Sequence, residues 1–458
     1  MTPTYFEILE RFENGKPIRK DDWDFEYILM TTRKLVKKYD LKWDKEIIVT
    51  NDNFLADRVF QAGFELAEQV GIYNFNSGKA FRFSKEELQQ GLENASRPII
   101  MGEGNDARLI RPRSILDPEP PLVWAGNPGA PTPEELFTPM VMSWAQEPIV
   151  DLITCGSMTH VDGHMMQAGG PLEIAVTRRE LIYLRSALRQ VGRPGMGMLA
   201  AQSSVSELGD LSVANPEFLR PCDSHLIPML NELMIDRVSI LRVMNSLDYG
   251  MHNASLPTVM VGGLAGDAPG AAVVQTAAFI LANLVCKATY HLLHPIHIRH
   301  VATSTRGVMW VQNIVQQAFA RNAPCVIFSD IYPKSGAMTK ELLYETAANA
   351  IVVTVSGGHL EGVGSADGAA PNCSGLEARL MGEVGQAVTK QNLNLEEANH
   401  LVLQLLAKYE HVFNLPGGNP GLPFDQVYDL KTLQPTPEWD KMYIQVKKDL
   451  IDLGLEMY

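Results

Sequence analysis

Two side chains able to bind a cation or move a proton stand directly behind a short apolar run in the second half of the sequence. Asp330 follows the run CVIF almost immediately, and Tyr332 comes two residues later. A carboxylate in this position can bind a cationic amine or orient a proton donor. The simpler alternative is a loop aspartate that caps the next turn. We predict that Asp330 and Tyr332 are the catalytic residues.

Other polar residues occupy comparable positions behind further apolar runs. We predict that they bind substrate, although each can equally be an ordinary polar residue at a junction between strand and loop. They are Gln202, Asn245, His297 and Arg299.

Four histidines spaced three apart resemble a metal site at first inspection. The segment HLLHPIHIRH contains His291, His294, His297 and His300. Pro295 separates a helix end from a strand start, so the four rings cannot share one face. On a strand, His297 and Arg299 would point to the same side, which favours an inward polar pair. The chain also lacks HExxH and zinc-type cysteine spacing, so we predict no metal.

The glycine-rich segments carry neither of the common phosphate-binding patterns. GNPGAP, GRPGMG, GGLAG and LPGGNPG contain no GxxxxGK[ST] and no strand-bound GxGxxG. No Gly-x-Ser-x-Gly nucleophile elbow occurs either. These glycines are more typical of tight turns after strands.

The elements that would position these side chains are alternating short apolar runs and longer helical segments. Strand and helix alternating in this way indicate a parallel sheet with helical crossovers, and eight units favour a closed barrel whose active site lies at the carboxyl ends of the strands. The eight predicted strands cover 121–127, 148–157, 193–204, 238–246, 258–266, 295–305, 324–333 and 350–358.

The predicted fold class is α/β, a (β/α)₈ TIM barrel with a helical N-terminal extension and C-terminal helices. The extension spans 1–115, the barrel 116–392, and a helical segment that packs on the barrel 393–458. Within the extension, Ser84 and Glu87 have the spacing of a capping box at a helix start.

Composition excludes several classes of protein. Of the 458 residues 46% are hydrophobic, and the net charge of −14 with a pI near 5.3 argues against nucleic acid as partner. The apolar stretch 271–286 contains Gln275 and Asn283 and falls short of a membrane span. Five scattered cysteines and no apolar signal segment at the N-terminus indicate a cytoplasmic protein with reduced thiols.

Several segments, in order along the chain, carry a resemblance to a known family. They are AGFELAEQVGIY (62–73), GNPGAP (126–131), GRPGMGM (192–198), DSH followed by LNEL (223–233), PIHIR (295–299), GLEARLMGEVG (375–385), and YDLKT with PTPEW (428–439). Nearly end to end, the chain resembles the monomethylamine methyltransferases of methanogenic archaea.

This resemblance implies a barrel enzyme that passes a methyl group to the cob(I)amide of a separate corrinoid protein. The corrinoid (cobalamin) would be supplied by that partner, with no cofactor bound tightly by the chain itself. The resemblance also implies a homo-oligomer, a hexamer in the family. No membrane or nucleic-acid partner is expected.

The sequence departs from the family at the site that handles the amine. Family members carry pyrrolysine just after the GRPGMG strand, and Leu199 stands at that position here. Leu226 and Ala254 stand where two supporting glutamates are expected, and Asp330 stands where the family has a glutamine. We therefore place Leu199, Leu226 and Ala254 in the predicted substrate site.

Two hypotheses of function follow. In the first, the protein transfers methyl from a small methylated amine other than monomethylamine. A cationic N-methyl donor already has a neutral leaving amine, so it needs only placement and charge complementarity. Asp330 would pair with the cation, Trp124 and Tyr332 would line the site, and His297, Arg299 and Gln202 would bind a substrate carboxylate or amide.

In the second hypothesis, the barrel is catalytically altered and binds a small ligand or a corrinoid partner without methyl transfer. The apolar replacements favour this hypothesis, whereas the new carboxylate at Asp330 favours the enzyme. A zinc-dependent methanol-type methyltransferase is disfavoured by the metal spacing.

Overall fold

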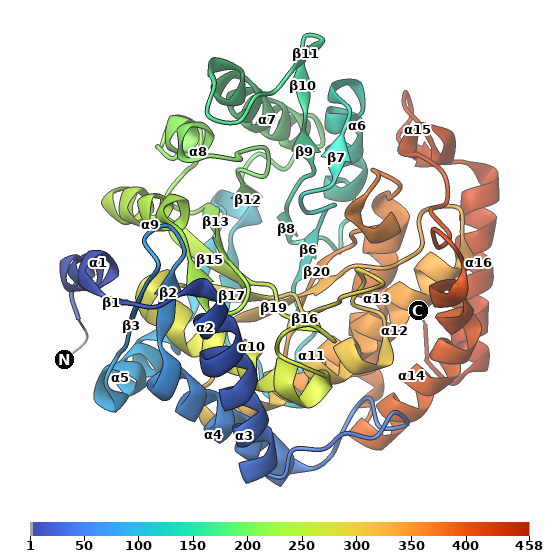
Figure 1. Cartoon of the computed structure of the whole chain (residues 1–458). Helices are drawn as coiled ribbons and strands as arrows, with labels where there is room; N and C mark the ends of the chain where they lie inside the picture. Colours follow the sequence, from blue (N-terminus) through green and yellow to red (C-terminus); the bar gives the residue numbers. More distant parts are fainter. Residues whose placement is uncertain (1–2, 458) are drawn as a thin grey trace.

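The centre of the molecule is a closed barrel of eight parallel strands. The computed structural model describes residues 3–457, and the barrel occupies the middle of the ring of helices in Figure 1. Going round the barrel, the strands are β12 (Gly197–Ala200), β13 (Ser224–Met229), β15 (His252–Pro257), β17 (Tyr290–Leu293), β19 (Ile327–Ile331), β20 (His359–Gly362), β6 (Val123–Ala125) and β8 (Leu152–Ile153). The predicted TIM-barrel class is confirmed.

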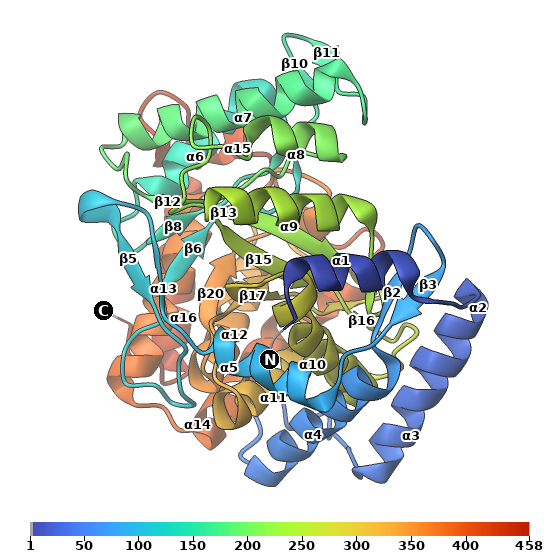
Figure 2. The same ribbon diagram turned by 90° about the vertical axis from the view of Figure 1, so that its left-hand side faces the viewer.

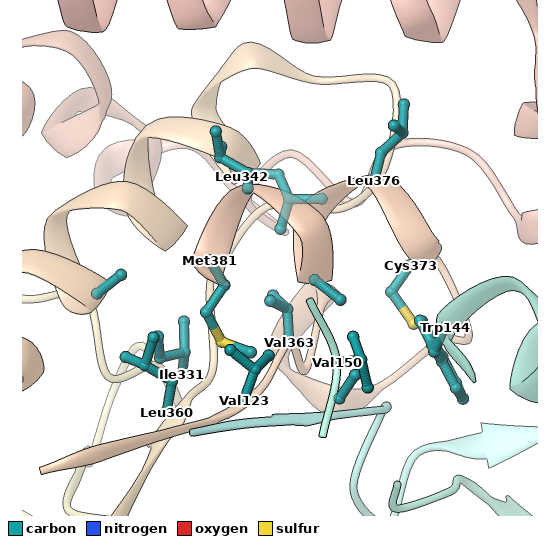
Figure 3. Packing of buried hydrophobic residues seen from close by; sticks show 14 of the residues in the cluster. Val123, Trp144, Val150, Ile331, Leu342, Leu360, Val363, Cys373, Leu376 and Met381 are labelled. Atoms are coloured by element: carbon teal, nitrogen blue, oxygen red, sulfur yellow. The ribbon is translucent and has the colours of Figure 1, made fainter. Parts of the chain in front are cut away.

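A helix follows each barrel strand, which completes eight β/α units. In chain order they are α6 (Glu134–Ala145), α7 (Pro171–Gln190), α8 (Glu207–Val213), α9 (Arg237–Tyr249), α10 (Ala268–Val285), α11 (Arg306–Asn322), α12 (Lys340–Ser356) and α13 (Gly375–Gln391). Figure 3 shows Val123 of β6 and Leu360 of β20 pointing outward from the barrel toward Met381 of the covering helix α13. Because strand side chains alternate, the neighbours of these outward residues face the barrel interior.

Four of the eight predicted strands are confirmed and four are wrong. The predictions at 121–127, 148–157, 193–204 and 324–333 contain β6, β8, β12 and β19. The runs 238–246 and 350–358 lie mainly in helices, and 258–266 and 295–305 contain only two-residue strands outside the barrel, β16 (Met260–Val261) and β18 (Ile296–His297).

The cause of these errors is that buried apolar runs have no period that separates strand from helix. All but two residues of α12 are buried, so its second half, AIVVTVS, has the composition of a buried strand. The segment SHLIPM, which none of the eight predicted strands covers, forms β13, a six-residue barrel strand with Ser224, His225 and Pro228 among its members.

The N-terminal segment packs along the side of the barrel (Figure 2). Its helices are α1 (Tyr5–Asn14), α2 (Lys20–Asp22), the π-helical η1 (Trp23–Met30), α3 (Thr31–Lys38), α4 (Asn53–Val70) and α5 (Lys85–Ala95). The predicted capping box at Ser84 and Glu87 is confirmed, with each side chain bonded to the other's backbone N–H. Helix α4 packs on α10 and α11, so this segment and the barrel helices share one hydrophobic core.

Short strands accompany these helices. One small sheet contains β1 (Lys16–Pro17), β3 (Lys79–Phe81), β2 (Ile72–Asn74) and β14 (Met234–Ile235). The remaining pairs are β4 (Ile99–Met101) with β5 (Arg108–Ile110), β7 (Pro131–Thr132) with β9 (Ser157–Met158), and β10 (His160–Val161) with β11 (His164–Met165). Two short 3₁₀ turns are η2 (Gly104–Asp106) and η3 (Ala366–Gly368).

The β4–β5 hairpin closes the amino end of the barrel. Met101 and Ile110 are fully buried against the side chains of the barrel interior. The N–H of Gly102 donates to the carbonyl of Cys222, just before β13, and the N–H of Glu103 donates to Gly195, just before β12. The opposite, carboxyl end of the barrel is therefore the end available for a site.

The chain ends in helices that pack beside α12 and α13. They are α14 (Leu395–Tyr409), the 3₁₀ turn η4 (Glu410–Asn414), α15 (Phe424–Val427) and α16 (Pro437–Asp452), with the strand pair β21 (Tyr428–Asp429) and β22 (Gln434–Pro435). Among the described residues, one helix, α10, is apolar and long enough to cross a membrane by composition, but 94% of it is buried inside the protein. Such burial is typical of a core helix.

Candidate active site

Three aromatic side chains fill the barrel interior from strands on opposite sides. The Trp124 ring lies 5.5 Å from Tyr290 and 5.0 Å from Phe328 between ring centroids. These residues come from β6, β17 and β19, and β6 is not a neighbour of β17. The contacts therefore cross the interior and establish which residues of each strand point inward.

The three apolar residues of the predicted substrate site lie in the same interior cluster. Leu199 on β12 and Ala254 on β15 are buried, and Leu226 on β13 packs against them while half-buried. Leu226 is in register with Ala254, and Leu199 is in register with Ser224. The structure thus brings these three predicted residues together on one side of the barrel.

A pair of acidic side chains stands on the other side. Asp330 on β19 is in register with Glu361 on β20, and Glu361 is in register with Trp124. Strand alternation points Asp330 inward with Phe328, and Glu361 inward because Leu360 points outward. Asp330 is 3% exposed and Glu361 is fully buried.

This acid pair has unused hydrogen-bonding capacity. No N–H or O–H group of the described residues donates to either oxygen of Glu361 or to Oδ1 of Asp330, and the indole N–H of Trp124 has no acceptor among them. Other buried polar atoms of the described residues also lack a partner, but these four lie at one level of the barrel interior, on the neighbouring strands β19, β20 and β6. Two of the three side chains are acidic, which makes this level a candidate site for a ligand that donates hydrogen bonds or carries positive charge.

Burial and the neighbouring Asp330 carboxylate raise the pKa of Glu361 well above its ordinary value. Burial also raises the pKa of Tyr290, and the charges of Glu361 and Asp330 add to this effect. Burial beside a second carboxylate therefore favours the protonated form of Glu361.

His294 and Tyr332 complete the surroundings of Asp330. Nδ1 of His294 lies 2.7 Å from Oδ2 of Asp330, and the His294 ring meets the Tyr332 ring edge-on at 5.2 Å. The Tyr332 hydroxyl donates to the carbonyl of Pro128 across 3.1 Å, which tethers the end of β19 to the loop after β6. Tyr332 therefore borders the acid pair and links two mouth loops.

Buried glutamates on the outer helices hold the loops at this end of the barrel. Glu180 on α7 accepts hydrogen bonds from the backbone N–H groups of Gln202 and Ser203, directly after β12. Glu345 on α12 accepts from the backbone N–H groups of Lys334 and Ser335, directly after β19. Burial raises the pKa of both glutamates, that of Glu345 to about 7. The loops are fixed by these acceptors rather than by loop sequence alone.

Gln202 lies near this end of the barrel, but three other predicted residues do not join the cluster. The side-chain N–H₂ of Gln202 has no acceptor among the described residues. Asn245 lies on the outer helix α9, where its amide donates to the carbonyl of Ala214 at 2.8 Å. Its assignment to the end of a barrel strand was wrong, because residues 238–246 are helical.

The inward pair of His297 and Arg299 was also a wrong expectation. Strand β18 ends at His297, and the chain turns so that the N–H of Val301 donates back to the His297 carbonyl at 2.8 Å. Arg299 is exposed. His297 instead lines a groove of about 820 Å³ with Trp43 and Arg306, between the N-terminal segment and η4. Burial lowers the pKa of His297 there.

Glu361 and His294 are the site residues that the sequence reasoning missed. Glu361 was overlooked because the eighth strand was placed over 350–358, before Gly357 and Gly358. Gly357 has φ +95 and caps α12 in the left-handed conformation, so the strand that follows, HLEG, puts a carboxylate at its second inward position. His294 was noticed as part of the histidine series, but the spacing gave no reason to prefer it to His297.

The described residues contain no group of three or more His, Cys, Asp or Glu side chains arranged to hold a metal ion.

The fold defines a TIM-barrel protein, and the buried acid pair marks a candidate ligand site at the carboxyl end of its strands. A family model described as monomethylamine methyltransferase MtmB matches residues 4–455. MtmB1 of Methanosarcina barkeri and MtmB of Methanosarcina mazei are each 32% identical to the chain over 454 residues, covering 98% of this chain and 98% of theirs. The chain belongs to the MtmB family.

Solved structures agree with this assignment. The crystal structure of Methanosarcina barkeri MtmB superimposes with a TM-score of 0.95 and 30% sequence identity, over 99% of this chain and 98% of that one. The structure of the hydroxylamine complex of MtmB matches equally well. The predicted recognition of the family is confirmed, whereas the correspondence of Leu199 with pyrrolysine stays a prediction.

Proposed function

We propose that this protein transfers a methyl group from a small cationic N-methyl compound, other than monomethylamine, to the cob(I)amide of a separate corrinoid protein. Membership of the MtmB family supports methyl transfer from a methylated amine. The proposed departure from monomethylamine depends on the barrel mouth of this chain.

The observation that carries the proposal is the buried acid pair facing an apolar wall. Asp330 and Glu361 provide negative charge in a region where Leu199, Leu226 and Ala254 provide none. A buried carboxylate with unused acceptors is stabilised by a cation. Leucine can form no adduct with an amine, so a donor that needs covalent activation is disfavoured.

In the proposed reaction the protein binds and orients the donor and supplies no nucleophile of its own. The reduced cobalt of the partner's corrinoid is the nucleophile and accepts the methyl group, while the amine leaves with the electron pair of the C–N bond. The residues of this chain bind and orient the donor: Asp330 pairs with its charge, and Trp124 and Phe328 offer aromatic surface to its methyl groups. His294 holds Asp330 in place.

The second candidate function is ligand binding without methyl transfer. It is favoured by the same apolar residues, because a barrel that has lost its amine-handling groups need not retain catalysis. The carboxylate of Asp330 beside Glu361 favours the enzyme, because loss of the amine-handling groups alone would remove charged side chains from the mouth without placing a new one there.

We further propose a corrinoid protein as partner, a homo-oligomer as the working form, and the cytoplasm as the compartment. All five cysteines, which lie within the described part of the chain, are unpaired, in keeping with a reducing compartment. Sedimentation of the purified protein tests the assembly, for which a hexamer is the expected state.

A donor panel tests the proposed function. The purified protein is mixed with cob(I)alamin and, in turn, monomethylamine, trimethylamine, tetramethylammonium and a betaine-type zwitterion, and methylation of cobalt is followed by absorbance. We expect transfer from at least one permanently cationic donor and none from monomethylamine. If no donor serves, also when the corrinoid protein encoded nearest the gene replaces cob(I)alamin, the binding-only function is supported.

A further inference from the structure

We infer that Asp330 and Glu361 act as one unit that holds a single proton and a single negative charge, and that this unit makes the barrel mouth selective for monocations over neutral amines. The inference rests on the proposed function for its substrate class, but it can be tested without methyl transfer.

The geometry provides the first support. The two residues are in register on neighbouring strands, and both side chains point into the barrel within a site that is at least 97% buried at each position. Neither oxygen of Glu361 receives a hydrogen bond from the described residues. The Asp330 carboxyl, on the paired strand, can form a hydrogen bond with a Glu361 oxygen. Such a bond between two carboxyl groups requires that one of them carries a proton.

No lysine or arginine is among the titratable groups that face the acid pair. The titratable groups facing the pair are His294, which follows β17 and lies 2.7 Å from Asp330, together with Tyr290 on β17 and Tyr332 after β19. The next inward residue on β20, His359, has its pKa lowered to about 3 by burial and by nearby arginines. The unit itself, two carboxylates that share one proton, has a charge of −1.

Asp330 and Glu361 then have different tasks. Asp330 carries the charge and is fixed by His294, whereas protonated Glu361 cancels the repulsion that a second carboxylate would cause. A monocation restores electrical neutrality to the buried mouth. A neutral amine leaves the negative charge of Asp330 uncompensated. A dication brings one more positive charge than the unit can neutralise.

Isothermal titration with tetramethylammonium tests the inference. Titrations at about pH 8, where imidazoles are ordinarily neutral, in two buffers of different ionisation enthalpy give both affinity and protons released. Wild type should bind the cation with almost no proton release, and tert-butyl alcohol, a neutral probe of similar size, should not bind. Asp330→Asn should bind at least about fivefold more weakly and release about one proton per cation, because Glu361 must then ionise.

Glu361→Gln is the matched variant. It keeps the shape and the Asp330 charge but removes the carboxyl group that holds the proton, so it should bind the cation without releasing a proton. Infrared spectra of the full-length wild type should contain a protonated carboxyl band at neutral pH that is absent from Glu361→Gln. This band keeps the inference testable if Asp330→Asn does not fold.

Three results would overturn the inference: no binding of tetramethylammonium to wild type, equal proton release by wild type and Asp330→Asn, or no carboxyl band assignable to Glu361. If the titrations agree with the inference but no donor methylates cobalt, the proposed function fails and the inference stands. If methyl transfer occurs without these signatures, the inference alone fails.

Discussion

Asp330 is the residue on which the proposed donor depends, because it is the carboxylate that His294 approaches within 2.7 Å inside the barrel mouth. Replacing one partner of a buried ionic contact by a neutral side chain loses much interaction free energy, whereas the same replacement at the protein surface changes the free energy little.

We predict that Asp330→Asn weakens binding of the cationic donor by about 1–3 kcal/mol, which corresponds to a rise in KM of about 5- to 150-fold. Steady-state methyl transfer measures this effect. Asp452→Asn, at the exposed end of α16, is the matched control and should leave KM unchanged. If KM and kcat are both unaltered in Asp330→Asn, Asp330 does not belong to the site.

Leu199 is a second residue with a measurable consequence. It is 1% exposed and packs in the interior cluster with Trp124 and Tyr290. We predict that Leu199→Ala lowers the free energy of unfolding by about 2–5 kcal/mol, because it leaves a cavity in a packed interior. Urea denaturation measures the change. A loss below about 1 kcal/mol would mean that Leu199 borders open space rather than packed side chains.

At this scale the sequence predicted several residues that the structure brings to the barrel interior and mouth. They are Asp330 and Tyr332, predicted from their position behind an apolar run, and Leu199, Leu226 and Ala254, predicted from the family resemblance; their roles stay predictions. Glu361 was not predicted, because a residue's inward or outward direction depends on strand phase, and a strand placed a few residues early loses that phase.

At the scale of elements, helix α12 fixes the loop that follows β19. Glu345 accepts from Lys334 N–H at 2.8 Å, from Ser335 N–H at 3.1 Å and from the hydroxyl of Ser304. Its pKa is raised to about 7, chiefly by burial, while these hydrogen bonds oppose the shift. The folded protein therefore retains the Glu345 proton at pH values where the unfolded chain has released it.

We predict that stability of the wild type relative to Glu345→Gln falls as the pH rises from about 4.5 to about 7 and is constant above. The sign follows because the folded pKa exceeds the unfolded one, so ionisation costs more in the folded state across this window. Thermal melts of both proteins at intervals between about pH 5 and pH 8 measure the difference. A difference that grows in the opposite direction would contradict the account, and Glu93→Gln on the exposed face of α5 should show no trend.

The elements themselves were predictable to different degrees. The strands β6, β12 and β19 were predicted because each lies within a continuous apolar run. The second half of α12 was predicted as a strand, since a helix buried on all sides has no amphipathic period. The barrel strand SHLIPM was missed, because a short strand can carry polar inward residues.

At the scale of the whole molecule, the N-terminal segment and the barrel form one hydrophobic core. Gly63 on α4 lies so close to α10 that an added Cβ would be 2.5 Å from Cβ of Thr276 and 3.1 Å from the Val273 carbonyl oxygen. The sequence predicted a separate extension because core sharing between distant segments has no local signature. The division at residues 115 and 392 therefore stays a proposal about organisation.

We predict that Gly63→Ala destabilises the entire protein by about 1–3 kcal/mol through overpacking, lowering a single thermal transition rather than producing two. Calorimetry measures this. Gly307→Ala on α11 is the control, because its added methyl group would be 3.5 Å from Trp43, an ordinary contact distance. Separate melting of the N-terminal segment would contradict a shared core.

The most direct test of the central claim is a crystal structure of the protein with tetramethylammonium. We expect the cation at the carboxyl end of the barrel strands, against the carboxyl groups of Asp330 and Glu361. It should lie within about 6 Å of an aromatic ring of the interior. A cation bound instead in the groove lined by His297, or no bound cation at the barrel mouth, would contradict it.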